Sequence, residues 1–134
     1  MPKVKDIHHV AIVVDQMDKA LGFWQDALGI ALTERRTVPA EQSEIAFLPL
    51  KSAEVELVQP LTQDSGIAKY LAKRGPGMHH LCVEVDDIEA MLKQLQAKQV
   101  RLINEVPRQA EDGKRYAFVH PESTGGVLVE LYQL

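Results

Sequence analysis

The sequence contains a single cysteine, Cys82, among 134 residues. One thiol cannot form an intramolecular disulfide, and the first residues of the sequence lack the long apolar segment of a secretory signal. We therefore expect a protein of the reducing cytoplasm. Cys82 itself lies inside an apolar run, where a small buried side chain is its ordinary role.

Long apolar runs and basic clusters are also missing. No stretch approaches the roughly 20 apolar residues that a membrane-spanning helix needs, so we expect no membrane role. The formal net charge is −4, and Lys and Arg do not gather into a stripe that could neutralise many phosphates, so nucleic acid is not an expected partner. With 46% hydrophobic and 25% charged residues, the composition is that of a soluble globular domain.

The most informative feature of the sequence is an internal repeat. Segment 8–15, HHVAIVVD, resembles segment 79–86, HHLCVEVD, which follows 71 positions later. Near the end of each half the sequence matches again, because Val55-Glu56-Leu57 corresponds to Val129-Glu130-Leu131, 74 positions later. The difference of three positions indicates a change in the length of one loop.

Each repeat contains one stretch with apolar residues at helical spacing, over 17–28 and over 88–95. We expect a helix in each stretch. Aspartates that can cap the starts of these helices are Asp15 or Asp18 for the first and Asp86 or Asp87 for the second. Gly29, which tolerates the left-handed conformation, is expected to end the first helix.

Three strands are expected after each helix. The predicted strands cover 31–38, 44–50 and 53–59 in the first half and 101–105, 115–120 and 126–134 in the second. The repeat unit is therefore strand, helix and three strands, which predicts an α+β fold of two βαβββ modules within one domain, 1–134. The modules are expected at 1–61 and 77–134, joined by a linker, 62–76, that contains a short helix at about 66–73.

Two histidines and two glutamates occupy corresponding places in the repeat. His9 and His80 project from equivalent faces of the two first strands, and Glu56 and Glu130 from equivalent faces of the two last strands. Each of these residues taken alone is ordinarily a strand residue without a ligand. Their coincidence instead predicts one mixed nitrogen and oxygen site for Zn²⁺, Co²⁺, Ni²⁺, Fe²⁺ or Mn²⁺, and the absence of thiolates disfavours a purely structural zinc.

Three other histidines are interpreted differently. His8 and His79 alternate with the candidate ligands along their strands, so we expect them to point the opposite way and to serve as core or hydrogen-bonding residues. His120, which precedes a proline, is expected to be a turn residue.

These residues and several motifs resemble the vicinal oxygen chelate superfamily, which has the glyoxalase and bleomycin-resistance fold. Within it the sequence looks most like the methylmalonyl-CoA epimerases. The matching stretches are 7–12, 55–57, 65–71, 77–81, 85–88 and 120–131, the last reading HPESTGGVLVEL. Together they extend over nearly the whole sequence.

The resemblance implies two βαβββ modules that form a curved mixed sheet around a metal, with His9, Glu56, His80 and Glu130 as its ligands. It further implies that Glu44 is one acid/base residue and Glu130 the second. The implied reaction interconverts the (2R) and (2S) forms of methylmalonyl-CoA through a metal-stabilised enolate. The expected cofactor is a divalent ion, with Co²⁺ favoured over Zn²⁺, Ni²⁺ and Mn²⁺, and the expected partners are an acyl-CoA substrate and a second copy of the chain.

Two alternatives stay open. A glyoxalase I-type lactoylglutathione lyase uses the same ligand pattern, and a drug-sequestering protein has the same fold without a metal. The linker helix and the Ser-Thr-Gly-Gly run favour the epimerase, and the complete ligand set disfavours the metal-free protein. The sequence departs from the epimerase pattern at Glu122, where close relatives usually carry Lys, and in the acidic segment 109–113, whose carboxylates would repel CoA phosphates lying near them.

Overall fold

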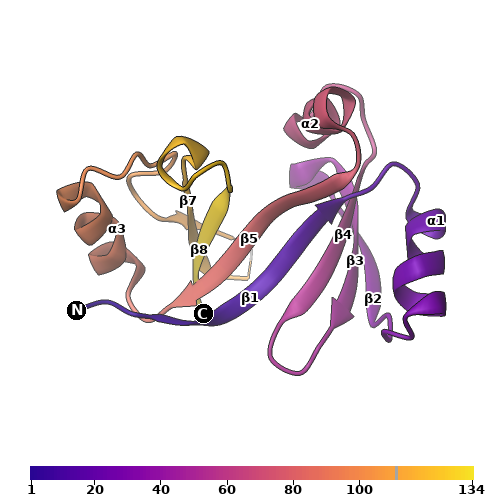
Figure 1. Ribbon diagram of the computed structural model, residues 1–134, viewed down its shortest axis with the longest axis horizontal. Coiled ribbons are helices and arrows are strands. Elements are labelled where there is room, and N and C mark those ends of the chain that lie inside the picture. The colour runs from indigo at the N-terminus through magenta and orange to yellow at the C-terminus, as the bar shows by residue number, and fades with distance from the viewer. Residues whose placement is uncertain (111) are drawn as a thin grey trace. The chain divides into compact units, whose positions relative to one another are not determined.

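The computed structural model describes residues 1–110 and 112–134, so position 111 lies outside the described residues. The elements in chain order are β1 (Val4–Val13), α1 (Met17–Leu21), η1 (Gly22–Ala27), β2 (Glu34–Val38), η2 (Pro39–Glu41), β3 (Ser43–Pro49), β4 (Glu54–Pro60), α2 (Gly66–Arg74), β5 (Gly77–Val85), α3 (Ile88–Ala97), β6 (Arg108–Gln109), β7 (Arg115–Val119), η3 (Pro121–Ser123) and β8 (Val129–Gln133) (Figure 1). The predicted α+β order of strand, helix and three strands is thus present twice. Within the described ranges, no helix is long and apolar enough to cross a membrane.

The chain forms two compact units, and their boundaries cut through two strands. Unit 1 comprises residues 1–9 and 80–134, and unit 2 comprises residues 10–79. Strand β1 therefore gives its first part to unit 1 and its last part to unit 2. The strand order is β2-β3-β4-β1 in unit 2 and β1-β5-β8-β7-β6 in unit 1. Because β5 and β8 are parallel while β7 and β8 are antiparallel, the sheet is mixed, as predicted.

In unit 2, the two faces of the sheet are covered by different helices. Alternate residues of β3 and β4, among them Leu48 and Leu57, pack against Met17 and Leu21 of α1 in an apolar core. The opposite face carries the cluster of Ala11, Ile45 and Val58, against which Ile67 of α2 packs. The alternation of side chains along the strands thus separates a face toward α1 from a face toward α2.

The helix predicted over 17–28 is confirmed in extent and runs as α1 followed by the π-helical η1. Gly29 follows with a φ of 80°, as expected for a residue that ends a helix. The predicted aspartate cap is wrong for this helix, because residue Gln16 is the N-cap and its side chain makes no capping bond. The amide oxygen of Gln59 on β4 accepts the hydrogen bond of the Met17 N–H instead, at 2.7 Å.

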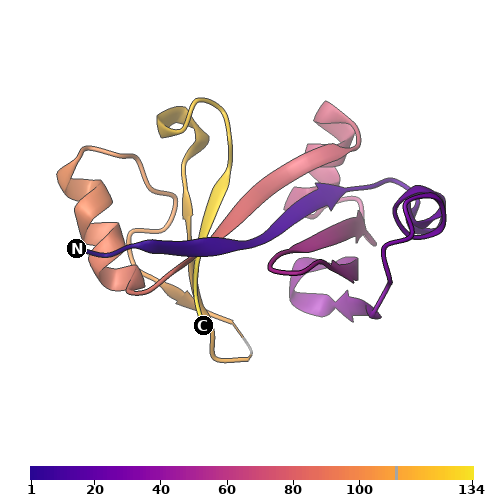
Figure 2. The same cartoon turned by 60° about the horizontal axis from the view of Figure 1, so that its bottom comes forward.

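In unit 1, α3 covers one face of the sheet (Figures 1 and 2). Ile88, Met91 and Leu92 of α3 pack against Ala117 and Leu131 of the strands in a second apolar core. The prediction of a helix over 88–95 is confirmed, and the cap is one of the two predicted aspartates, since Asp87 accepts a hydrogen bond from the Ala90 N–H. The amide oxygen of Gln133 on β8 accepts the bond of the Ile88 N–H at 2.7 Å. Gln59 in unit 2 and Gln133 in unit 1 therefore make equivalent contacts, each with the first residue of a helix.

One predicted strand is wrong. Segment 101–105 contains only an isolated bridge, between Leu102 and Val119. The N–H groups of Ile103 and Asn104 both point at the carbonyl of Phe118, and the Asn104 side chain accepts the Phe118 N–H at 2.8 Å. A side-chain bond thus replaces the backbone bond that would continue the ladder. The last strand also begins later than predicted, at Val129, after two glycines with positive φ.

Candidate metal centre

Three of the four predicted ligands lie together in unit 1. The distances are 3.1 Å between the Nε2 atoms of His9 and His80, 3.4 Å from His9 Nε2 to Glu130 Oε1, and 3.1 Å from His80 Nε2 to the same oxygen. His9 and Glu130 are 6% and 8% exposed. These three side chains form a group that could hold a metal ion.

The strands bring these residues together through their pairing. Lys3 bonds Asp86 and the Lys5 ammonium lies 3.1 Å from Glu84, so β1 and β5 run in opposite directions. This antiparallel alignment puts His9 beside His80. The parallel register of β5 with β8 then brings Glu130 next to them. Residues 71 positions apart in the sequence therefore become neighbours.

The spacing of the three atoms fits a divalent ion. Ligand atoms that are each about 2.0 to 2.2 Å from an ion, at tetrahedral to octahedral angles, lie about 2.9 to 3.5 Å from one another. The three measured separations fall within this range. Three mutually adjacent atoms also form a poor hydrogen-bond arrangement, because the bonds cannot all be straight. Two imidazole nitrogens and one carboxylate oxygen are donors suited to Zn²⁺, Co²⁺, Ni²⁺, Fe²⁺ or Mn²⁺.

The carboxyl group of Glu130 is held in its ionised form. Burial raises its pKa, but hydrogen bonds and charge interactions with His80 and then His9 outweigh this effect and lower the pKa from 4.5 to about 2. The group is therefore a carboxylate at neutral pH. A buried negative charge beside two imidazoles is what a cation requires.

Aromatic rings line the cluster. The rings of His80 and Phe118 lie edge to face at 5.6 Å, and the His9 and Tyr132 centroids are 6.4 Å apart. The expectation that His8 points away from His9 is wrong, because their rings lie 5.1 Å apart and both lie beside Tyr132. Its expected hydrogen-bonding role is confirmed by a contact of 2.8 Å between the two Nδ1 atoms.

Glu56, the fourth predicted ligand, belongs to unit 2. It is half-buried on β4, opposite Phe47 of β3, on the sheet face that points away from α1. In unit 1, Glu130 stands opposite Phe118 in the same way. Each glutamate also precedes by three residues the glutamine that bonds a helix start. The two glutamates are thus equivalent in their own units.

Glu44 lies on the other face of the unit 2 sheet from Glu56. Its partner across β3 and β4 is Gln59, whose side chain reaches the start of α1. The guanidinium of Arg35 donates to Glu44 Oε1 and to Asp18 Oδ1, both at 2.9 Å. The hydrogen bond to Glu44, followed by that to Asp18, raises the pKa of Arg35. Glu44 is therefore part of an ion-pair group on the side of α1.

The remaining sequence-predicted features lie elsewhere. His120 accepts the Glu122 N–H and begins η3, which confirms its turn role. Glu122 forms an exposed ion pair with Arg101 at 2.8 Å. The acidic segment 109–113 includes position 111, outside the described residues, and Asp112 in it pairs with Lys114.

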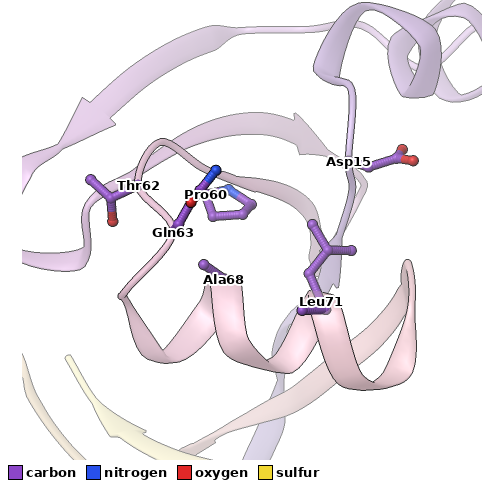
Figure 3. A pocket seen from close by; sticks show the side chains of 7 residues that line it. Asp15, Pro60, Thr62, Gln63, Ala68 and Leu71 are labelled. Carbon is purple, nitrogen blue, oxygen red and sulfur yellow. The ribbon is translucent and has the colours of Figure 1, made fainter.

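Unit 2 contains a pocket of about 520 Å³ between the end of β4 and α2 (Figure 3). Ala68 and Leu71 lie on the side of α2 that faces Pro60 and Asp15. Thr62 and Gln63 add polar groups to its lining. The lining contains the carboxylate of Asp15 and no histidine, so the pocket is distinct in composition from the metal cluster.

Sequence reasoning did not find the contacts of His8, Tyr132 and Arg35. Phe47 and Phe118 were also missed, although they lie 71 positions apart and face the two glutamates. Extending the repeat search to single aromatic positions would have found this pair. The His8 contact has no such signal, because strand alternation predicts the opposite direction.

The chain is similar to known proteins over most of its length. The sequence model of the Glyoxalase/Bleomycin resistance protein/Dioxygenase superfamily matches residues 8–118. The mitochondrial methylmalonyl-CoA epimerase of Homo sapiens is 40% identical over 128 residues, which cover 95% of this chain and 73% of that protein.

Two solved structures have the same fold. The methylmalonyl-CoA epimerase of Mycobacterium tuberculosis superposes with a TM-score of 0.84 and 36% identity, covering 97% of this chain and 88% of that one. A variant of the Streptomyces coelicolor methylmalonyl-CoA epimerase, in complex with 2-nitronate-propionyl-CoA, gives a TM-score of 0.87 and 27% identity over 98% of this chain and 95% of that one.

Proposed function

Since the chain belongs to the Glyoxalase/Bleomycin resistance protein/Dioxygenase superfamily, we propose that it is a metal-dependent epimerase that interconverts (2R)- and (2S)-methylmalonyl-CoA. The observation that supports this best is the triangle of His9, His80 and Glu130, with its separations of 3.1 to 3.4 Å. We infer the identity of the substrate from the relatives that are named methylmalonyl-CoA epimerases. The active form is proposed to be one domain in which Glu56 is the fourth ligand.

The chemistry of this substrate matches the donor set. Its α-carbon lies between a thioester and a carboxylate, so a base can remove the α-proton while the electron pair moves to the thioester oxygen. Return of a proton to the opposite face of the same carbon completes the epimerisation. A divalent ion, when bound, would supply Lewis-acid stabilisation of the negative charge on that oxygen. The side chains of His9, Glu56, His80 and Glu130 would hold the ion and leave positions open for substrate oxygens.

Two carboxylates are proposed to move the proton, Glu44 on one face of the α-carbon and Glu130 on the other. Glu130 would therefore have two proposed roles, as a ligand of the ion and as a group that moves the proton. Support for Glu44 comes from segment 42–47, QSEIAF, which resembles the family at the position of its acid/base glutamate. To accept a proton from a substrate bound beside Glu56, its carboxylate must leave the ion pair with Arg35 and reach the opposite face of the unit 2 sheet.

The test is an exchange experiment in D₂O with a single epimer of methylmalonyl-CoA. We expect the parent protein to introduce deuterium at the α-carbon and to produce the other epimer, because both events follow from removal of the same proton. The hemithioacetal of glutathione and methylglyoxal, offered in parallel, should not be converted. Proton NMR and separation of the epimers measure both reactions. Conversion of the hemithioacetal without epimerisation of methylmalonyl-CoA would reject the epimerase function and would identify a glyoxalase I-type lyase.

A homodimer is proposed as the functional form, and a cytoplasmic location is proposed with it. The single cysteine is buried, which is compatible with a reducing compartment. Exposed apolar side chains such as Val4, Ile7 and Met78 provide surface that a second copy could cover. Light scattering at micromolar concentration is expected to give twice the 15.0 kDa mass of the chain. A monomeric mass under these conditions would reject the dimer while leaving the epimerase intact.

A further inference from the structure

We propose that His8 is a positioning residue for the metal centre, because it accepts a hydrogen bond from Nδ1–H of His9 and so leaves the Nε2 lone pair of His9 for the ion. The inference rests on the proposed metal site and extends it to a residue outside the four ligands. Its basis is the contact of 2.8 Å between the two Nδ1 atoms.

The contact restricts the tautomers of the two rings. A neutral imidazole carries one proton and one lone pair on its two nitrogens, so one of the touching Nδ1 atoms must donate and the other must accept. If His9 donates, its Nε2 has a lone pair directed at His80 and Glu130. If His8 donates, His9 carries its proton on Nε2 and cannot bind a cation there. Metal binding therefore requires the first arrangement, in which His8 is the acceptor.

The position of the His8 ring is itself fixed by its surroundings. It packs against Tyr132 with the centroids 4.8 Å apart and the planes tilted by 57°. Tyr132 also lies next to His9, with the Lys114 ammonium 5.8 Å from its ring centroid. The His8 ring is thus held within hydrogen-bonding distance of the His9 Nδ1–H, so the two side chains lose less conformational freedom when the ion binds.

His8, His9 and Cys82 also lie close enough to form a metal-binding group of their own. That alternative uses His9 Nδ1 as a ligand, whereas the positioning role uses it as a donor. Cys82 is fully buried. A second ion per chain would identify this alternative, so the stoichiometry of bound metal is part of the test.

The experiment compares His8→Phe with His8→Asn. Phenylalanine keeps a ring against Tyr132 but accepts no hydrogen bond, whereas the amide oxygen of asparagine can take the place of Nδ1. His79→Phe is the matched control, because it changes the residue before the other histidine ligand. The His79 ring lies edge to face with Tyr70, with the centroids 4.7 Å apart. Calorimetric titration of each metal-free protein with Co²⁺ gives Kd and stoichiometry. The visible absorption of the bound Co²⁺ reports its coordination.

We expect His8→Phe to raise Kd by roughly 10- to 100-fold, the range found when an outer-shell partner of a ligand is lost. The Kd values of His8→Asn and His79→Phe should stay within a few-fold of the parent Kd, which is less than the change of roughly 10-fold expected when an outer-shell partner is lost. Thermal unfolding of the metal-free variants separates this effect from a loss of folding.

Each other outcome rejects the proposal. Unchanged affinity in His8→Phe, equal losses in His8→Phe and His8→Asn, or two ions per parent chain would each show that His8 does not act as an acceptor for His9. A parent protein that binds one Co²⁺ in this pattern yet fails to epimerise methylmalonyl-CoA would reject the proposed function and leave the His8 inference standing. A parent that binds no metal would reject both.

Discussion

Replacement of both His9 and His80 by alanine is expected to abolish stoichiometric metal binding and to reduce epimerisation to the background rate. The two imidazoles provide two of the three atoms in the triangle, and the carboxylates of Glu130 and Glu56 are not expected to hold a divalent ion against water without them. Without the ion, the Lewis-acid stabilisation of the negative charge on the substrate oxygen is lost. Elemental analysis of the purified variant and the D₂O exchange assay measure the two effects.

The double variant is expected to remain folded. The apolar core of unit 1 includes Ile88, Leu92 and Ala117 and lies on the face of the sheet that α3 covers. The side chains of His80 and Glu130 point to the opposite face, so their replacement leaves this core intact. Circular dichroism and thermal unfolding provide this check. His120→Ala is the matched control for loss of a histidine, since His120 begins a turn elsewhere, and it should keep its metal. Stoichiometric metal in the double variant would exclude the triangle as the binding site.

The second large effect is expected for Glu44→Gln, in which epimerisation should fall by roughly 10² or more while metal content is kept. This is the range expected when a positioned general base is lost. Glutamine has the size of glutamate and can still accept the hydrogen bond from Arg35, so the fold should change little. Solvent exchange should persist for the epimer whose proton Glu130 removes and should fail for the other. The rate of exchange for each epimer separately is the decisive measurement.

The ion pair with Arg35 supplies a competing explanation and a control. If Glu44 only stabilises the α1 side of the sheet, then Glu44→Gln and Arg35→Ala should both lower stability slightly, by less than about 1 kcal/mol for a partly exposed pair, with activity kept. If Glu44 is the base, Arg35→Ala should retain activity, because it frees the carboxylate, and only Glu44→Gln should lose it. Parent-like epimerisation by Glu44→Gln would remove Glu44 from the mechanism.

The repeat made most of the fold and most of the centre predictable. Matching HHVAIVVD with HHLCVEVD identified the two first strands, and helical spacing identified α1 with η1 and α3. The same match selected His9 and His80, whose Nε2 atoms lie 3.1 Å apart, and the match of Val55-Glu56-Leu57 with Val129-Glu130-Leu131 selected Glu130. Periodicity succeeds here because each of these residues lies on a regular strand or helix, and the regular backbone sets the direction of its side chain.

The misses have local causes that periodicity does not encode. Segment 101–105 has the composition of a strand, but the side chain of Asn104 takes a backbone bond of Phe118. The start of α1 is fixed by Gln59, a residue 42 positions away, which no local capping rule could select. Glu44 and Glu56 fall on opposite faces because β3 and β4 pair Phe47 with Glu56, a register set by the turn between the strands.

The division of β1 between the two units has a consequence for synthesis on the ribosome. His9 is made early, together with the residues of unit 2 that follow it, but its partners His80 and Glu130 belong to segments made much later. All residues of unit 2 are present once residue 79 has been made, whereas unit 1 is complete only after β8 has been made. Residues 1–9 therefore lack their unit 1 partners until β5 and β8 have been made, and the metal centre can form only after the residues of unit 2.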